Sequence, residues 1–226
     1  MAATLQRIWQ VLVGKGWYFL TTLMGGWAAA VSVAICALIF ALLFGLFIAS
    51  LRAARWRGLR VLGTAYIEFF RGTPLLAQLF VIYFGLPDTG FQPSPLQAAI
   101  VGLGLNGAAY LSEIYRAGIE SIHRGQMEAS LSLGMTPASA MRYIILPQAI
   151  RTMLPPITNF AIVLLKDTAI IFAVGVVEIM ALARNLVTET LQSAVIYLIA
   201  GAIYLCMTIP MARIAARLER AKRAWQ

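Results

Sequence analysis

The sequence predicts an all-α membrane protein that forms a single domain over residues 1–226 and crosses the bilayer with five helices. Hydrophobic residues make up 61% of the chain and charged residues 12%, whereas a soluble domain is about half apolar and a quarter charged. The apolar residues also lie in long uncharged runs, and a run of about 18 residues can cross the hydrocarbon core as a helix. Most Lys and Arg residues lie between or after these runs, which is typical of membrane proteins.

Five apolar runs are predicted to be the spanning helices. In chain order they cover residues 16–51, 59–86, 95–115, 155–183 and 190–214. The first run is far longer than the apolar region of a cleavable signal peptide, so we expect it to be retained as a span. Cys36 and Cys206 lie inside apolar runs, where free cysteine behaves as a small hydrophobic residue. We therefore expect neither cysteine to form a disulfide or to bind a metal.

The basic residues outside the predicted spans indicate the orientation of the chain. Cytoplasmic loops carry an excess of Lys and Arg, and five crossings place the two termini on opposite sides. One predicted side holds Arg52, Arg55, Arg57, Arg60, Arg116, Arg124, Arg142, Arg151, Arg213, Arg217, Arg220, Lys222 and Arg223, and the other holds Arg7, Lys15 and Arg184. We therefore expect the N-terminus outside, the C-terminus in the cytoplasm, and the long segment 115–154 on the cytoplasmic side.

The sequence lacks the motifs of several catalytic and binding classes. No G-x-x-x-x-G-K-[ST] phosphate loop is present, because Gly14-Lys15-Gly16 has neither the upstream glycine nor the following hydroxyl residue. The only histidine, His123, has no neighbouring pair of metal ligands or catalytic partners. The formal charge of +9 is explained by topology and anionic lipid, so it does not indicate nucleic acid binding. We expect this chain to have no enzymatic activity and to bind no cofactor or metal.

The long cytoplasmic segment is predicted to contain two short helices joined at a bend. Small residues in the stretch 128–133 permit close approach of another backbone, and Gly134 suits a left-handed helix stop. Thr136 can cap a second helix with Pro137 at its first position, and we expect Pro147 to end that helix. Such a hairpin at the membrane surface is shaped to fit a groove in another protein.

The hairpin resembles the coupling motif of the permease subunits of bacterial ABC importers, which reads E-A-A-x-x-x-G-x(9)-I-x-L-P. The motif positions are matched by Glu128, Ala129, Gly134, Ile144, Leu146 and Pro147. Ser130 replaces the second alanine of the motif and leaves this position small. The resemblance implies that the coupling loop at about 124–150, including Gly125 and Gln126, contacts a separate ATPase subunit.

Further blocks are similar to the polar amino acid permease group, whose members import histidine, glutamine, glutamate, arginine and cystine. The blocks cover residues 70–75, 109–118, 125–126 and 165–168. The resemblance extends over nearly the whole chain and implies a type I, MetI-like permease fold in the bacterial inner membrane. It also implies a complex of two permease subunits, identical or paralogous, with two ATPases that bind ATP and Mg and an external solute-binding protein.

Charged and polar residues inside the predicted spans mark a candidate substrate path. A charge at the bilayer centre costs roughly 2.5–3.5 kcal/mol on insertion scales, so such residues usually face a partner or a cavity. At about 1.5 Å per residue, Arg71 and Lys166 both lie about 17 Å from the cytoplasmic ends of their spans, beside polar interruptions of the helix. The predicted path residues are Arg71, Thr73, Asn159, Lys166, Asp167 and Thr168. The alternative is a structural ion pair, for example between Arg71 and Asp167.

Other charged residues are assigned to pairs near the membrane surfaces. Glu113 and Arg116 are three positions apart on one helical face, so a salt bridge is the preferred interpretation. Glu178 could pair with Arg184 or gate the outer side.

Two other functions remain open at this point. An ion-driven secondary amino acid transporter could use Glu68 and Asp167 as proton carriers, and a membrane scaffold would transport nothing. Neither alternative explains the coupling motif, so the sequence favours an ABC importer permease for a polar amino acid.

Overall fold

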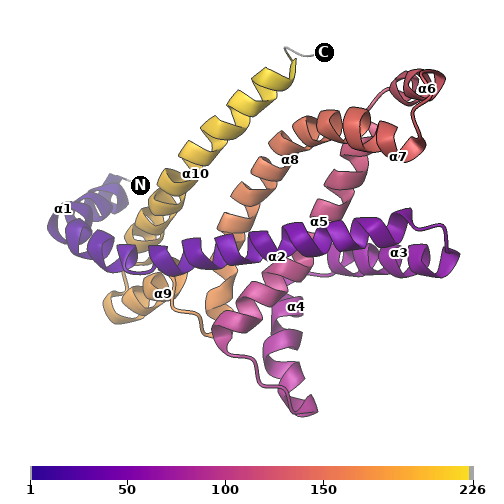
Figure 1. Cartoon of the computed structure of the whole chain (residues 1–226). Coiled ribbons are helices and arrows are strands. Elements are labelled where there is room, and N and C mark those ends of the chain that lie inside the picture. Colours follow the sequence, from indigo (N-terminus) through magenta and orange to yellow (C-terminus); the bar gives the residue numbers. More distant parts are fainter. Residues whose placement is uncertain (1, 224–226) are drawn as a thin grey trace.

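The computed structural model is all-helical over the residues that it describes (Figure 1). It describes residues 2–223, with side chains for residue 6 and residues 8–220. The longer helices are α1 (Ala2–Met24), α2 (Trp27–Ala53), α3 (Arg57–Gly72), α5 (Pro95–Glu120), α8 (Leu146–Asp167), α9 (Ile179–Thr190) and α10 (Ser193–Arg223). The shorter ones are α4 (Leu75–Phe80), η1 (Val81–Gly85), η2 (Leu86–Thr89), α6 (Arg124–Ser132), α7 (Pro137–Ala140), η3 (Met141–Ile145) and η4 (Thr168–Val174). The side chains of Arg7, Lys222 and Arg223, which contributed to the predicted orientation, lie outside the described residues.

Two apolar clusters hold these helices together. The first joins α1, α9 and α10, and its buried members include Phe19, Leu23, Ile179 and Ile196. The second joins α2, α4, α5, α8 and η4, and its buried members include Val33, Leu79, Leu103, Leu164 and Ile171. Helix α5 therefore lies at the centre of the second cluster, in contact with helices on several sides.

Helix α2 packs along α5 at close range because both helices carry small residues at the contact. A Cβ atom on Gly104 of α5 would lie 2.4 Å from Cδ1 of Phe40, and one on Gly107 would lie 2.9 Å from Cβ of Ala41. Small residues at such contacts let two helices in a membrane approach closely and gain dispersion energy. The apolar run that was predicted to span the membrane therefore also forms much of the internal contact of the protein.

The first predicted span, residues 16–51, lies within one candidate span, Ile8–Ala53, which a short turn divides into two helices. Helix α1 ends at Met24 and α2 begins at Trp27, with a turn at Gly25 and Gly26 between them. A Cβ atom at position 26 would lie 2.5 Å from the carbonyl carbon of Glu178. The absence of a side chain at Gly26 allows the turn to approach the backbone that precedes α9, so the apolar run contains two helices.

The second predicted span, residues 59–86, is a broken helix. Helix α3 ends at Gly72, and helical structure resumes at Leu75 after a bend of 105°. Pro74 has no N–H to donate and disfavours helical backbone at the preceding residue, and Thr73 is extended, with φ −113° and ψ 148°. The bend divides this span into α3 and a second arm that contains α4, η1 and η2.

The fourth predicted span, residues 155–183, has the wrong bounds at both ends. Pro147 does not end a helix, since one helical stretch runs from Pro137 to Val174 through η3 and α8. The π-helical turn η3 ends at Ile145, two residues before this proline, and a local π-turn is a common way to accommodate an interruption of a helix. At the other end, Gly175 has φ +90° and terminates η4 before α9 begins.

Three helical stretches among the described residues are long and apolar enough to cross a membrane, or four if the bent pair forms one span. They are Ile8–Ala53, Pro137–Val174 and Ser193–Arg220, with the bent pair Arg57–Gly72 and Leu75–Thr89. Helix α5, which contains the third predicted span, is not among these stretches. It carries the half-buried residues Asn106 and Glu113 and the buried Ser112. The count of five crossings and the orientation of the termini stay predictions.

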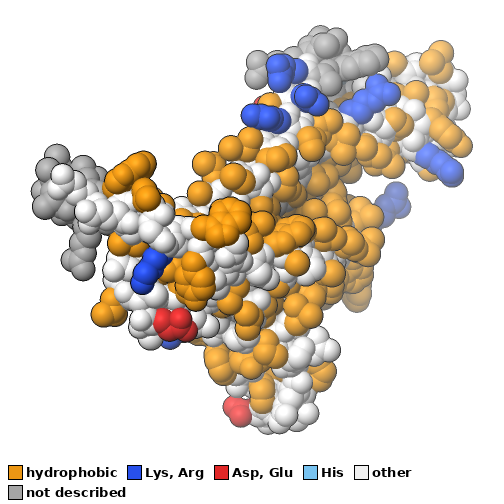
Figure 2. Space-filling view, turned by 90° about the vertical axis from the view of Figure 1, so that its left-hand side faces the viewer, with side chains coloured by type: hydrophobic (Ala, Val, Ile, Leu, Met, Phe, Trp, Pro, Cys, Tyr) orange, Lys and Arg blue, Asp and Glu red, His pale blue; other side chains and the backbone are white. Residues whose placement is uncertain are grey.

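The surface of the molecule has the side-chain distribution of a membrane protein. Figure 2 shows one face whose middle carries mainly hydrophobic side chains, while several Lys and Arg side chains lie toward its upper end. That end carries the C-terminal part of α10, and the α6–α7 hairpin also lies in the upper part of the molecule in Figure 1. The distribution agrees with the basic side that the sequence predicts.

Candidate functional site

The α6–α7 hairpin, defined as residues 124–140, forms in the segment where the sequence predicts it. Helix α6 begins after His123, whose Nδ1 atom accepts a hydrogen bond of 3.1 Å from the backbone N–H of Gly125. This cap was not predicted, because histidine is not among the preferred residues at this position. The cap closes the first turn of α6, which leads from the end of α5 to the candidate coupling residues.

Gly134 forms the bend of the hairpin, as predicted. Its φ is +80°, in the region that residues with a Cβ atom rarely adopt. The N–H of Met135 donates to the carbonyl of Ser130 over 3.1 Å, and the N–H of Gly134 donates to that of Leu131 over 2.9 Å. These bonds satisfy the last carbonyls of α6 and turn the chain toward α7.

Thr136 caps the second helix of the hairpin, again as predicted. Its Oγ1 accepts a hydrogen bond of 3.2 Å from the N–H of Ser139, and Pro137 lies at the start of α7. The side chain of Gln148 donates to Gln126 Oε1 over 3.4 Å and to the carbonyl of Ile144 over 2.8 Å. The hairpin is therefore tied to the start of α8, with which its second helix is continuous.

The hairpin divides into a face that packs on the protein and a face that is open. Ser130 is 5% exposed and donates to the carbonyl of Gln126 over 2.6 Å, so the residue that departs from the motif lies on the inner face. Glu128, Ala129 and Gly134 are exposed. Leu133 is 84% exposed, although water disfavours a large apolar side chain. The outer face therefore offers small, acidic and apolar groups that another protein could cover.

A second polar site surrounds the break between α3 and α4. The Nε2 atom of Gln78 donates to the carbonyls of Phe70 and Thr73 over 2.9 and 3.1 Å, and to Oγ1 of Thr73 over 2.8 Å. The Nδ2 atom of Asn106 donates to the carbonyl of Phe70 over 3.0 Å and to Oε1 of Gln78 over 3.0 Å. In hydrocarbon such carbonyls need partners inside the protein, and these two amides supply them.

Arg71 extends this site toward α5 and α8. Its guanidinium carbon lies 5.3 Å from the ring centroid of Tyr110, and the ring of Tyr110 stacks on that of Phe160 at 5.9 Å. A cation near the face of an aromatic ring is attracted by the quadrupole of the ring. Arg71 also lines a hollow of about 470 Å³ together with Glu68, Tyr110 and Glu113.

The other predicted path residues are not all part of this group. Lys166 is exposed and Asp167 is half-buried, and the described residues form no ion pair between Arg71 and Asp167. Thr168 is buried and donates to the carbonyl of Leu165 over 2.7 Å. Asn159 instead turns toward α10, where its Nδ2 atom lies 3.2 Å from Oε1 of Glu219. Of the predicted path residues, Arg71 and Thr73 therefore belong to one site, and the other four are distributed along α8 and its end.

The predicted salt bridge at the end of α5 is confirmed, and it is part of a network with two further residues. Glu113 pairs with Arg116 at 2.7 Å and also with Arg52 of α2, while Arg116 reaches Glu120. The sequence could not indicate Arg52 as a partner, because it precedes Glu113 by 61 positions.

The predicted pairing of Glu178 with Arg184 is wrong. Glu178 is fully buried and accepts hydrogen bonds from the N–H groups of Met180 and Ala181, at 2.8 and 2.9 Å, as the cap of α9. The hydroxyl of Tyr204 donates to it over 2.9 Å, and Arg184 is exposed. The carboxyl group therefore joins α9 to α10 rather than pairing with a surface arginine.

Residues 41–224 match the family described as binding-protein-dependent transport system inner membrane component. The chain is 44% identical over 192 residues to the probable amino-acid permease protein YxeN of Bacillus subtilis (strain 168), a match that covers 84% of this chain and 86% of that protein.

Two solved structures resemble the fold. One, described as an amino acid ABC transporter with histidines, has a TM-score of 0.85 and 37% identity, and the match covers 89% of this chain and 94% of that one. The other, the methionine ABC transporter MetNI in an inward-facing conformation, has a TM-score of 0.69 at 22% identity and covers 87% and 95%. The MetI-like fold is thus confirmed, and the ATPase of such a transporter is a separate subunit. The chain belongs to the family of binding-protein-dependent transport system inner membrane components and is the permease subunit of an ABC transporter.

Proposed function

We propose that this chain moves a polar amino acid across the bacterial inner membrane as one of two permease subunits of an importer. The α6–α7 hairpin receives mechanical work from an ATPase, and the polar site at the α3–α4 break borders the path of the substrate. The name of the relative YxeN and the histidines of the similar transporter support an amino acid as the substrate class.

The exposed outer face of the hairpin is the observation that carries the proposal. Glu128, Ala129 and Gly134 match the coupling motif and are open to a partner, and a left-handed glycine sets the bend between the two helices. Because α7 continues through η3 into α8 as one helical stretch, a displacement of the hairpin is transmitted to the spanning part of α8. The remaining motif residues, Ile144, Leu146 and Pro147, lie at this junction.

The complex that this function requires has several further parts. ATP and Mg bind on the ATPase, and one hairpin per ATPase requires two permease subunits, either two copies of this chain or this chain with a paralogue. An external solute-binding protein delivers the amino acid. The permease then alternates between outward-open and inward-open states around the path.

Charge on the path matches the charges of an amino acid. Arg71 offers a cation to the carboxylate, and Glu68 lies on the same hollow and offers an anion to the ammonium group. Lys166 and Asp167 supply a second pair of opposite charges beside the buried hydroxyl of Thr168 at the end of α8. Broken helices and polar groups near the middle of a membrane are typical of substrate sites in transporters.

Uptake by the reconstituted complex tests this function. The permease and its co-purifying ATPase are placed in liposomes with the cognate solute-binding protein, and labelled amino acids are screened. We expect uptake that requires ATP, that persists when a protonophore removes the proton gradient, and that occurs with stimulation of ATP hydrolysis by loaded binding protein. Uptake without ATP that collapses with the proton gradient would instead indicate an ion-driven transporter.

A further inference from the structure

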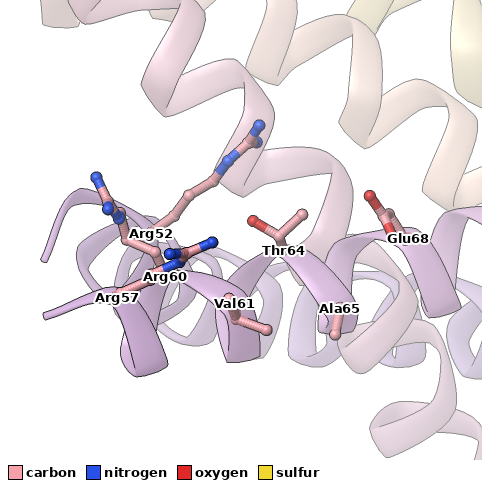
Figure 3. A pocket seen from close by; sticks show the side chains of 7 residues that line it. All are labelled: Arg52, Arg57, Arg60, Val61, Thr64, Ala65 and Glu68. Atoms are coloured by element: carbon pink, nitrogen blue, oxygen red, sulfur yellow. The ribbon is translucent and has the colours of Figure 1, made fainter.

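A basic pocket lies where the chain turns from α2 into α3 (Figure 3). Its volume is about 450 Å³, and its polar lining consists of Arg52, Arg57, Arg60, Thr64 and Glu68. Arg52 comes from the last turn of α2, and the other residues lie along one side of α3. Neither the coupling hairpin nor the α3–α4 break uses the arginines at positions 57 and 60.

The positive charge of this pocket is not neutralised within the described part of the chain. Arg52 pairs with Glu113, but Arg57 and Arg60 are exposed and form no ion pair or side-chain hydrogen bond there. Glu68 follows Arg60 by eight positions, or about 12 Å along the helix. Figure 3 shows the three arginines grouped at one end of the pocket and Glu68 at the other. An anion at the arginine end would therefore meet two unpaired guanidinium groups.

Apolar side chains with high exposure lie in and near the same pocket. Val61 lines the pocket and is 58% exposed, and Trp56 and Leu62, which are close to it in the chain but outside the lining, are 72% and 63% exposed. Tryptophan at the end of a membrane helix is typical of the interface between headgroups and acyl chains. The pocket therefore combines basic groups with an exposed apolar side chain, and these can contact the anionic headgroup and an acyl chain of one phospholipid.

We infer that the pocket binds the phosphate of an anionic phospholipid headgroup, with an acyl chain along Val61. Two guanidinium groups can hold phosphate oxygens through paired, charge-assisted hydrogen bonds. The predicted orientation places this turn at the cytoplasmic leaflet, whose anionic lipids attract such clusters. A lipid bound here would contact the first turns of α3, the helix that ends at the break at Gly72, and also Arg52, which pairs with Glu113 of the central helix α5.

Native mass spectrometry of the detergent-purified permease–ATPase complex tests the inference. The probes are phosphatidylglycerol and phosphatidylcholine with identical acyl chains, added at equal concentration. The test variant carries Arg57→Ala and Arg60→Ala, and the control carries Arg213→Ala and Arg217→Ala, two exposed arginines of α10. Both variants lose the same charge, and size-exclusion profiles check that both complexes remain assembled. A further arm adds inorganic phosphate as a competitor.

The expected result is a preference of the wild-type complex for phosphatidylglycerol that falls on the order of tenfold in the Arg57/Arg60 variant and is retained in the control. Equal losses in both variants would show diffuse attraction by net charge and would overturn the site. Displacement of the lipid by millimolar inorganic phosphate would overturn its assignment to a lipid. Unchanged phosphatidylglycerol binding in the Arg57/Arg60 variant would also contradict the inference.

Discussion

Two interruptions of helix carry the candidate functions of this permease, and they are built in different ways. At the α6–α7 bend, Gly134 adopts φ +80° and the last carbonyls of α6 bond to the N–H groups of the bend itself. At the α3–α4 break, the freed carbonyls of Phe70 and Thr73 bond to amides brought from Gln78 and Asn106. The first interruption is satisfied locally at an exposed surface, and the second needs side chains from other helical turns.

The difference follows from the surroundings of each break. Water can bond to any carbonyl that an exposed turn leaves open, so a glycine and a cap suffice there. Within hydrocarbon no water is available, and an open carbonyl costs several kcal/mol. Four predictions test this contrast, in order of decreasing expected effect.

Replacing Gly134 with valine is expected to have the largest effect. A left-handed backbone costs an L-residue about 1–2 kcal/mol, and more for a β-branched one, so the hairpin changes shape. We expect ATP-driven uptake to fall by about tenfold or more while ATP hydrolysis continues, measured in parallel in proteoliposomes. The matched control is Gly201→Val on α10, where a Cβ meets nothing within 4 Å and φ is not positive. Retained uptake in Gly134→Val would disprove the role of the bend.

Replacing Gln78 with leucine tests the other interruption. The carbonyls of Phe70 and Thr73 lose a buried partner, which costs about 1–3 kcal/mol for a buried unsatisfied group. We expect a lower thermal unfolding temperature for the purified permease. Gln10→Leu is the control, because Gln10 is exposed on α1 and has no side-chain hydrogen bond in the described residues. Equal unfolding temperatures in the two variants would show that the amide at position 78 is dispensable.

Replacing Arg71 with glutamine tests whether this residue acts on the substrate path or has only a structural role. Arg71 forms no ion pair within the described residues and contacts Tyr110 through its guanidinium group. The loss of this contact alone costs about 0.5–1 kcal/mol, so folding should change little. We expect the concentration of loaded binding protein needed for half-maximal uptake to remain similar, and the maximal rate to fall about fivefold, which corresponds to about 1 kcal/mol of activation free energy. The surface variant Arg184→Gln should leave the rate unchanged, and an equal rate in both variants would remove Arg71 from the path.

Replacing Ser130 with alanine is expected to have the smallest effect. The substitution restores the second alanine of the coupling motif and removes only an intrahelical bond to the carbonyl of Gln126. A bond of this kind slightly destabilises or bends a helix at most, so unfolding should shift by less than about 0.5 kcal/mol. Uptake and ATP hydrolysis should match those of the wild-type complex. A loss of coupling would show that the hydrogen bond of Ser130 to Gln126 sets the shape of α6 that the ATPase recognises.

The contrast between the two breaks also explains what could be predicted from the sequence. The turn at Gly134 and the caps at Thr136 and Pro137 depend on residues a few positions apart, and all three predictions are confirmed. The partners of the α3–α4 break could not be predicted in this way, because Asn106 lies 36 positions beyond Phe70. A polar amide inside an apolar helix was the available signal, and both Gln78 and Asn106 carry it.

Errors in the predicted spans have the same origin. Hydropathy alone cannot separate α1 from α2, since the turn at Gly25 and Gly26 depends on close packing against residues that precede α9. Pro147 was expected to end a helix, but the π-turn before it lets the helix continue. Glu178 was assigned to Arg184 by proximity in sequence, whereas its actual partner, Tyr204, is 26 positions away.

Contact between the α6–α7 hairpin and an ATPase is the central claim, and site-specific cross-linking tests it most directly. Cys36 and Cys206 are first replaced with serine, and a single cysteine carrying a photoreactive group is placed at Leu133 or at Leu191. Both positions are 84% exposed, but Leu133 follows α6 and Leu191 joins α9 to α10. We predict cross-linking of the assembled complex to the ATPase from position 133 and none from position 191. Cross-linking from position 191 together with none from position 133 would contradict the account.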